Sequence, residues 1–180
     1  MSEYFKEKNP ANVLYKDSKN IKLTSTDFKG MKKCFDDISI SFDDYDIILL
    51  GSGGVSESFK RGFESIGKNV ITVSRNSDIN YSNLDGFKKK QSIIFNCTPL
   101  GTTGKYENES PLSLFDKDDI VFDCVYNPIE TKFLKTAKDF GCLTVSGIDM
   151  LVNQAIYSLE YFLNVELDFQ ELKKIMKASL

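Results

Sequence analysis

Three glycines close together in the sequence could hold the phosphates of a nucleotide. Gly51, Gly53 and Gly54 follow the apolar run at residues 47–50 and precede a helix-compatible segment. Glycines let backbone N–H groups approach a pyrophosphate closely, and the start of a helix adds unpaired donors and a partial positive charge. The third glycine of the usual dinucleotide fingerprint falls at Ser56, so the pattern favours a dinucleotide site and leaves a plain strand-to-helix turn as the alternative.

The end of the next expected strand distinguishes NAD from NADP. In a nucleotide-binding sheet, an acidic residue about 20 positions past the glycines accepts the ribose hydroxyls of NAD, whereas a cation there favours the 2′-phosphate of NADP. Here the strand is followed by Ser74, Arg75 and Asn76. A guanidinium matches a phosphate, and Asn76 or Ser77 would add neutral hydrogen bonds. The pattern predicts NADP, with a solvated arginine at a strand end as the alternative.

Polar side chains also follow the third and fourth expected strands. Asn96, Thr98 and Pro99 come after the third, and Tyr126 comes after the fourth. Because the carboxyl edge of an open α/β sheet borders the ligand crevice, we expect both turns to face a ligand, with Tyr126 at the mouth and its hydroxyl free. A plain turn is the alternative for the first of them.

The residue types present restrict the chemistry. The chain has no histidine, which argues against Ser-His-Asp hydrolysis and against zinc-dependent alcohol oxidation, and no metal site is predicted. Proton transfer then falls to Asp, Glu, Lys, Tyr or Cys. Gln154 lies one turn after Met150 on the apolar stripe of an expected helix, where an amide either finds a buried partner or meets a ligand.

Strands and helices alternate along the part of the chain that must position these residues. Runs rich in Val, Ile and Phe are typical of parallel strands covered on both faces. They lie at residues 47–50, 69–73, 92–97, 119–125 and 142–145. Helices are expected after the glycines, at 129–140, at 148–164 and after Asp168. The predicted fold class is α/β: a Rossmann-like, doubly wound, mainly parallel sheet with helices on both faces.

The first part of the sequence predicts a different local structure. Residues 11–15 and 21–24 are β-prone and are separated by a polar segment, which indicates a hairpin. Thr26 and Asp27 can then cap a helix with an apolar stripe. That stripe consists of Phe28, Met31 and Phe35.

Composition narrows the class of protein further. A chain of 180 residues with 41% hydrophobic content can bury one substantial core. Its net charge of −3, without a basic stripe, argues against nucleic acid and membrane surfaces as partners. The charged N-terminus and the lack of a long apolar run predict a soluble, cytoplasmic protein. The four cysteines have no C-x-x-C spacing and are expected to be small core residues in a reducing compartment.

Taken in order, the motifs resemble those of the shikimate dehydrogenase family and its quinate/shikimate relatives. They are the glycine loop, residues 74–76 (similar to the family's Asn-Arg-Thr), 96–101, 123–131 and 147–155. The resemblance covers nearly the whole chain from about Ala11. It implies hydride transfer between NADP and the ring alcohol of shikimate, with 3-dehydroshikimate as the ketone, in aromatic amino acid biosynthesis.

The resemblance also implies roles for individual residues. Asp27 takes the position of the catalytic aspartate, Asn12 that of a substrate-binding asparagine, and Gln154 would reach the substrate together with Tyr126. The implied cofactor contacts are Gly51, Ser52, Gly53, Gly54, Val55, Ser74, Arg75, Asn76, Asn96, Thr98, Pro99, Val125, Gly147 and, near the nicotinamide, Met150. The chain departs from the family at Val13, in place of Thr, and at Ser25, in place of Asn.

The largest departure is at the front of the chain. Family members carry a substrate domain there, with hydroxyl side chains for the substrate carboxylate and a lysine that forms a dyad with the aspartate; Lys6 and Lys8 are the nearest upstream lysines. We therefore expect residues 1–26 to be a remnant of the substrate domain and 27–180 to be the NADP-binding domain. The apolar stripe would then be left open, to be covered by a second copy in a homodimer or by a partner substrate domain. The alternatives are a non-catalytic NADP-binding module and a dehydrogenase of a related hydroxy acid such as quinate.

Overall fold

The computed structural model describes residues 10–75, 77–87 and 91–178 and divides into two compact units. The first unit comprises Met1–Ile38 and Asp149–Leu180, and the second comprises Ser39–Ile148. Lys6, Lys8 and Asn76 lie outside the described residues. The expected boundary between family domains at residue 26 stays a prediction.

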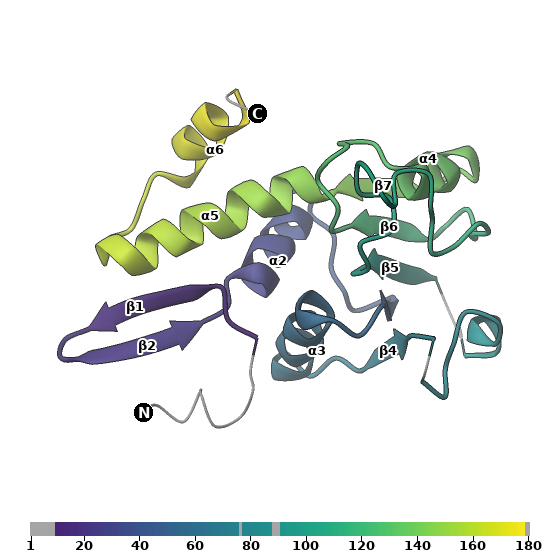
Figure 1. Ribbon diagram of the computed structural model, residues 1–180, viewed down its shortest axis with the longest axis horizontal. Coiled ribbons are helices and arrows are strands. Elements are labelled where there is room, and N and C mark those ends of the chain that lie inside the picture. The colour runs from purple at the N-terminus through teal and green to yellow at the C-terminus, as the bar shows by residue number, and fades with distance from the viewer. Residues whose placement is uncertain (1–9, 76, 88–90, 179–180) are drawn as a thin grey trace. The chain divides into compact units, whose positions relative to one another are not determined.

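The second unit is built on a parallel sheet. Its strands are β3 (Asp46–Leu50), β4 (Val70–Val73), β5 (Ser92–Asn96), β6 (Ile120–Asp123) and β7 (Leu143–Ser146). They lie in the order β4-β3-β5-β6-β7, and each neighbouring pair is parallel (Figure 1). This arrangement confirms the predicted Rossmann-like α/β class.

Helices cover both faces of this sheet. Phe59 and Phe63 of α3 (Gly54–Ser65) pack on Phe95, at 5.5 and 5.6 Å between ring centres. Side chains of α4 (Lys132–Asp139), among them Phe133, join a separate buried cluster with the alternate strand residues Ile48, Leu50, Ile94 and Val121. Alternate residues of a strand point to opposite faces, and helices cover both faces of this sheet. Both sets of strand residues are therefore buried, which explains why the strands are apolar on both sides.

Two connections of this unit differ from the expected pattern. The helix expected at 129–140 begins at Lys132, because the Thr131 side chain accepts a hydrogen bond from Leu134 N and caps the helix there. Between β4 and β5 the described chain forms a 3₁₀ turn, η1 (Leu84–Gly86), and β5 and β6 are joined by irregular chain.

The described residues of the first unit form a hairpin and three helices. Strands β1 (Val13–Asp17) and β2 (Asn20–Thr24) pair antiparallel, as predicted. The helices are α2 (Asp27–Asp37), α5 (Gly147–Leu163), which belongs to this unit from Asp149 onward, and α6 (Phe169–Lys177). Lys173 of α6 forms ion pairs with Asp37 of α2 and with Asp149 of α5, and these pairs tie the three helices together. In the described part of the chain, no helix has the length and apolar character needed to span a membrane.

The apolar stripe of α2 is not left open. Met31 and Phe35 are fully buried, so the expectation that they remain exposed is wrong. Exposed apolar side chains of this unit include two on the hairpin, where Leu14 is 53% and Ile21 is 60% exposed. Thr26 is the N-cap residue of α2 and Asp27 begins the helix, as predicted. The Thr26 side chain makes no capping hydrogen bond, and Asp27 N donates to Ser25 Oγ.

Gly30 permits the close approach of α2 and α5. A Cβ atom at this position would lie 2.7 Å from Gln154 Cβ, 2.8 Å from Gln154 N and 3.0 Å from Met150 O. Two of these three neighbours are backbone atoms, which cannot move away by rotation of a side chain. The helices can therefore keep this spacing only with glycine at position 30.

Gly30→Ala should destabilise the protein by about 1–3 kcal/mol, the usual range for overpacking, although alanine is the better helix former by about 1 kcal/mol. Urea unfolding followed by circular dichroism measures the change. Gly86→Ala is the matched control, because a Cβ there meets no atom within 4 Å. Equal stability of the two variants would contradict the close contact between α2 and α5.

Candidate functional site

The glycine loop joins β3 to α3 and is shaped by two glycines with different tasks. Gly51 has φ +107°, and a Cβ there would lie 3.0 Å from Thr98 Cγ2 and 3.2 Å from Cys97 O. Gly53 caps α3, and a Cβ there would have no atom within 4 Å. The loop is therefore packed against the end of β5 on one side and open at the start of the helix, which is the arrangement that a pyrophosphate needs.

Ser56 shows why the third glycine of the fingerprint is dispensable here. Its side chain is buried in the first turn of α3, and Oγ donates to Gly51 O at 2.7 Å. The hydroxyl is small enough for helix and strand to stay close, and it satisfies a carbonyl of the loop. The substitution maintains the loop geometry.

A cavity of about 590 Å³ opens at the carboxyl edge of the sheet beside this loop. Predicted cofactor residues line it: Gly51, Ser52, Gly53, Ser74, Arg75, Thr98 and Pro99. Sequence reasoning missed other lining residues, which are Tyr81, Cys97, Leu100, Tyr106, Glu109, Ser110 and Pro111. Most of these lie in the irregular connections that follow β4 and β5, where no periodic pattern marks a residue as facing the crevice.

Arg75 is exposed at the rim of this cavity, just after β4. Burial raises the pKa of the neighbouring Tyr81 hydroxyl, and the charge of Arg75 acts in the opposite direction. Ser77 accepts from Ser74 N at 2.9 Å and donates to Ile79 O at 2.5 Å, so its hydroxyl holds the turn rather than facing outward. The Ser77 hydroxyl thus holds the backbone of Ser74, the residue before Arg75.

One buried carboxylate links the ends of β5 and β6 with the start of α4. Asp123 accepts from Asn96 Nδ2 at 2.9 Å, from Val125 N at 2.9 Å and from Thr131 Oγ1 at 2.5 Å. Asn96 Oδ1 in turn accepts from Thr98 N and Thr98 Oγ1. The side chains of Asn96 and Thr98 therefore shape the wall of the cavity, and a direct contact of either with a cofactor stays a prediction.

Burial raises the pKa of Asp123 from 3.8 to about 6, although its three hydrogen bonds act in the opposite direction. No local pattern indicates this role, since Asp123 falls at the end of an apolar strand and its partners lie up to 27 positions away.

The remaining predicted cofactor residues are placed as follows. Gly54 and Val55 form the first turn of α3, Val125 is buried beside Asp123, and Met150 is buried in α5 of the first unit. A Cβ at Gly147 would lie 2.6 Å from Asp123 O, so this glycine lets α5 begin against the end of β6. Cofactor contacts by these residues stay predictions.

Asn12, Asp27 and Gln154 form a hydrogen-bonded cluster in the first unit. Asn12 Nδ2 donates to Asp27 Oδ1 at 2.8 Å and to Gln154 Oε1 at 3.0 Å, and Asn12 Oδ1 accepts from Thr26 N at 2.9 Å. The backbone donor fixes the amide orientation, so the Nδ2 group must face the carboxylate. Residues separated by 142 positions thus meet in one place. The substrate contacts that the resemblance implied for them stay predictions.

Thr26 and Ser158 support this cluster and were missed as site residues. Thr26 is fully buried, and its Oγ1 lies 3.2 Å from Gln154 Oε1 and 3.1 Å from Ser158 Oγ. The spacing of Gln154 and Ser158, one helical turn apart on α5, is the only signal that could have linked them.

Two groups of the cluster remain available to a ligand. Burial raises the pKa of Asp27, while hydrogen bonds from Ser25 and Asn12 act in the opposite direction. Within the described part of the chain, Gln154 Nε2 has no hydrogen-bond partner. A hydroxyl group could therefore donate to the Asp27 carboxylate and accept from Gln154. Asn12 is exposed, so the cluster can be reached from solvent.

Tyr126 belongs to the second unit, whereas this cluster belongs to the first. Its side chain is 50% exposed, and it is not among the cavity-lining residues that the structure describes. A role for Tyr126 in substrate binding stays a prediction.

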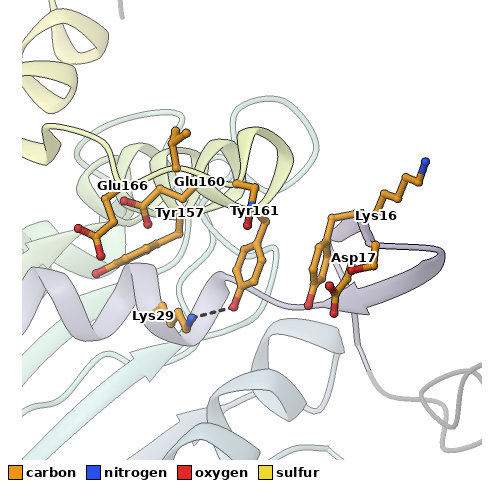
Figure 2. A pocket seen from close by; sticks show the side chains of 11 residues that line it. Lys16, Asp17, Lys29, Tyr157, Glu160, Tyr161 and Glu166 are labelled. Atoms are coloured by element: carbon orange, nitrogen blue, oxygen red, sulfur yellow. Dashed lines mark hydrogen bonds between the residues drawn. The ribbon is translucent and has the colours of Figure 1, made fainter.

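A separate cavity of about 660 Å³ lies in the first unit and contains none of the predicted site residues. Figure 2 shows Lys29 directed toward Tyr161, with Nζ donating to the hydroxyl at 2.8 Å. Glu160 and Glu166 line the same cavity. Lys16 and Lys29 are outnumbered in the lining by Asp17, Glu160 and Glu166, so this cavity does not favour an anionic hydroxy acid.

The parallel sheet, the glycine turn at its first strand and the cavity at its carboxyl edge define a Rossmann-like α/β protein. No family model matches the chain. The shikimate dehydrogenase (NADP(+)) of Methanococcus maripaludis is 34% identical over 171 residues, covering 83% of this chain and 61% of the relative. The protein of that name from Clostridium perfringens is 30% identical over 186 residues, covering 89% and 67%.

Solved structures agree with the sequence comparison. A chorismate mutase/shikimate 5-dehydrogenase fusion protein from Clostridium acetobutylicum aligns with a TM-score of 0.78 and 28% identity, over 94% of this chain and 67% of that one. The chain belongs to the shikimate dehydrogenase family. It spans about three fifths to two thirds of the length of the curated relatives that it matches.

The raised pKa of Asp123 predicts that the protein loses stability as the pH rises. Because its pKa is raised in the folded state, its contribution to stability is fully present below pH 3.8 and is lost as the pH rises through about 6. A tenfold change in proton affinity corresponds to about 1.4 kcal/mol, so the rise from 3.8 to about 6 corresponds to about 3 kcal/mol.

Relative to Asp123→Asn, which cannot titrate, the wild type should lose about 3 kcal/mol of unfolding free energy between pH ~3 and pH ~7.5. Urea unfolding at several pH values measures the difference. Asp44→Asn, at an exposed position, controls for the loss of one charge. A difference between wild type and Asp123→Asn that stays constant with pH would contradict the raised pKa.

Proposed function

We propose that this chain carries the NADP-binding part and the catalytic aspartate of a shikimate dehydrogenase, which reduces 3-dehydroshikimate with NADPH to shikimate when a substrate domain is supplied. The cluster of Asn12, Asp27 and Gln154 carries this proposal. A dinucleotide-binding module without catalysis would not need the Asp27 carboxylate, with its raised pKa, next to the Nε2 group of Gln154, which is unpaired among the described residues.

The cavity beside the glycine loop supports NADP as the cofactor. Gly53 leaves the start of α3 open to a pyrophosphate, and Arg75 offers a guanidinium at the place where a 2′-phosphate would be recognised. Arg75 is exposed, and Ser77 holds the backbone of the preceding Ser74, so the guanidinium is available to a phosphate. Tyr81 adds a flat apolar surface to the same cavity. Bound NADPH would supply the hydride.

The protein's own task is to hold the alcohol and to move its proton. In the oxidation direction, the ring hydroxyl donates to the Asp27 carboxylate, and Gln154 Nε2 donates to the hydroxyl oxygen. A carboxyl group whose pKa is raised by burial accepts a proton more readily than a solvated one, which suits a general base. In the reduction direction, the protonated Asp27 returns this proton to the carbonyl oxygen.

The substrate domain is the missing part of this proposal. In the family a lysine of that domain forms a dyad with the aspartate, and Lys29, on the same helix as Asp27, is already paired with Tyr161. The exposed Leu14 and Ile21 give the hairpin an apolar face that such a domain, or a second copy of the chain, would cover. Shikimate is the proposed substrate, and quinate is the alternative to be tested beside it.

Arg75→Ala should weaken NADPH binding by about 1–3 kcal/mol, the range for a charge-assisted hydrogen bond, and leave NADH binding nearly unchanged. Fluorescence titration of both dinucleotides measures this. Arg61→Ala is the matched control, since Arg61 pairs with Glu57 on α3 and does not line the cavity. Equal losses for NADPH and NADH would reject the assignment of Arg75 to the 2′-phosphate.

The chain alone should turn over shikimate at least ~10²-fold more slowly than an intact family member, because the dyad lysine and the carboxylate-binding side chains are missing. Adding a family substrate domain, free or fused, should restore activity to the wild type. Asp27→Asn should then remain ~10²–10⁴-fold slower while binding NADPH normally.

Asp36→Asn, an exposed position on the same helix, is the control and should follow the wild type. Steady-state oxidation of shikimate, and of quinate in parallel, provides the measurement. Full turnover by the 180 residues alone would refute the dependence on a substrate domain. Undiminished turnover by Asp27→Asn would refute the role of the aspartate.

A further inference from the structure

Two cysteines meet at the carboxyl edge of the sheet. Asn96 and Asp123 are paired as the last residues of β5 and β6, and Cys97 and Cys124 come directly after them. The hydrogen-bond ladder continues through them, because Cys124 N donates to Asn96 O at 3.0 Å. Their sulfur atoms lie 4.0 Å apart.

The geometry suits a covalent bond between these sulfur atoms. Neighbouring strands lie about 4.8 Å apart, within the range of Cα separations found in disulfides, which is roughly 4.4–6.8 Å. Paired positions on parallel strands also direct their side chains to the same face. Small rotations about the Cα–Cβ bonds can therefore bring the sulfurs to the bond length of about 2.05 Å.

The other two cysteines differ from this pair in their surroundings. Cys34 and Cys142 are buried, as expected for core residues, whereas Cys97 and Cys124 are only partly buried. Burial raises the pKa of the Cys34 thiol to about 12, which keeps it in the unreactive protonated form. Any reagent that enters the crevice meets Cys97 directly, since this residue lines the cavity of the glycine loop.

We propose that Cys97 and Cys124 form a thiol–disulfide site that a small disulfide, such as oxidised glutathione, oxidises. One thiolate attacks the small disulfide, which forms a mixed disulfide and releases one small thiol. The second thiolate then attacks the protein sulfur, which forms the Cys97–Cys124 bond and releases the second small thiol. The pair loses two electrons to the small disulfide, and the two cysteine protons end on the released thiols.

The dinucleotide crevice and this site share Cys97. Its carbonyl oxygen lies 3.2 Å from where a Cβ of Gly51 would be, so the cysteine backbone supports the glycine loop. A dinucleotide in the cavity would cover the Cys97 thiol. This part of the inference rests on the proposed function, and it links the redox state of the pair to the occupancy of the cofactor site.

Incubation with oxidised glutathione, followed by thiol counting, intact mass and peptide mapping without reductant, tests the disulfide. The wild type should lose two of its four thiols and two hydrogens, with the link mapped to Cys97 and Cys124. Cys97→Ser and Cys124→Ser should each retain one glutathione adduct instead. Cys142→Ala, which removes a buried thiol, should still form the bond. Stable adducts in the wild type, or a link that involves Cys34, would overturn the inference.

The rate of this oxidation with and without NADPH tests the shared crevice. At free NADPH about tenfold above its Kd, only about a tenth of the protein is unliganded, so oxidation should slow ~10-fold. An unchanged rate in a protein that binds NADPH would overturn the shielding. A protein that forms the Cys97–Cys124 bond but binds no NADPH would instead overturn the proposed function and support the thiol pair.

Discussion

The carboxyl edge of the sheet depends on a single buried side chain, Asp123. Its carboxylate joins the amide of Asn96, the backbone after β6 and the hydroxyl of Thr131 that caps α4. Three segments that would otherwise be independent loops are thereby fixed to one another. Because Asn96 also holds Thr98, which packs against Gly51, the turn that supports the glycine loop is fixed as well. A neutral amide or alcohol could not accept all of these hydrogen bonds with comparable strength. The raised pKa of Asp123 is the energetic cost of placing this group in the protein interior.

Much of the fold follows from local patterns in the sequence. Strands buried on both faces are continuous apolar runs, so β3 and β5 could be located to within about one residue. The helix expected at 129–140 was placed too early at its start, because Thr131 is the N-cap residue and its side chain accepts from Leu134 N. The exposure of the α2 stripe was also mispredicted. Burial depends on which helices cross, and Gly30, which permits the crossing, has no periodic signal of its own.

The candidate site was predictable where its chemistry is local and not where it depends on distant contacts. The glycine loop and Arg75 lie at fixed offsets from strands, so they could be assigned from spacing. Asn12 and Gln154 carry no such spacing, and family motifs alone pointed to them. Thr26 and Ser158 escaped notice because a buried hydroxyl resembles any other polar residue until its partners are known. Ser77, expected at a ligand, is used by its own turn.

The unpaired edges of the hairpin affect how a cell would handle this polypeptide. Among the described residues β1 pairs with β2 alone, so each strand keeps an outer edge of backbone donors and acceptors next to exposed Leu14 and Ile21. Open edges with apolar neighbours are templates for strand addition between molecules, and they are also segments that chaperones and proteases recognise. The steady-state abundance of this polypeptide should therefore follow the supply of whatever covers the hairpin. The amount of the polypeptide could then change with the fate of uncovered chains, without any change in the residues of the candidate site.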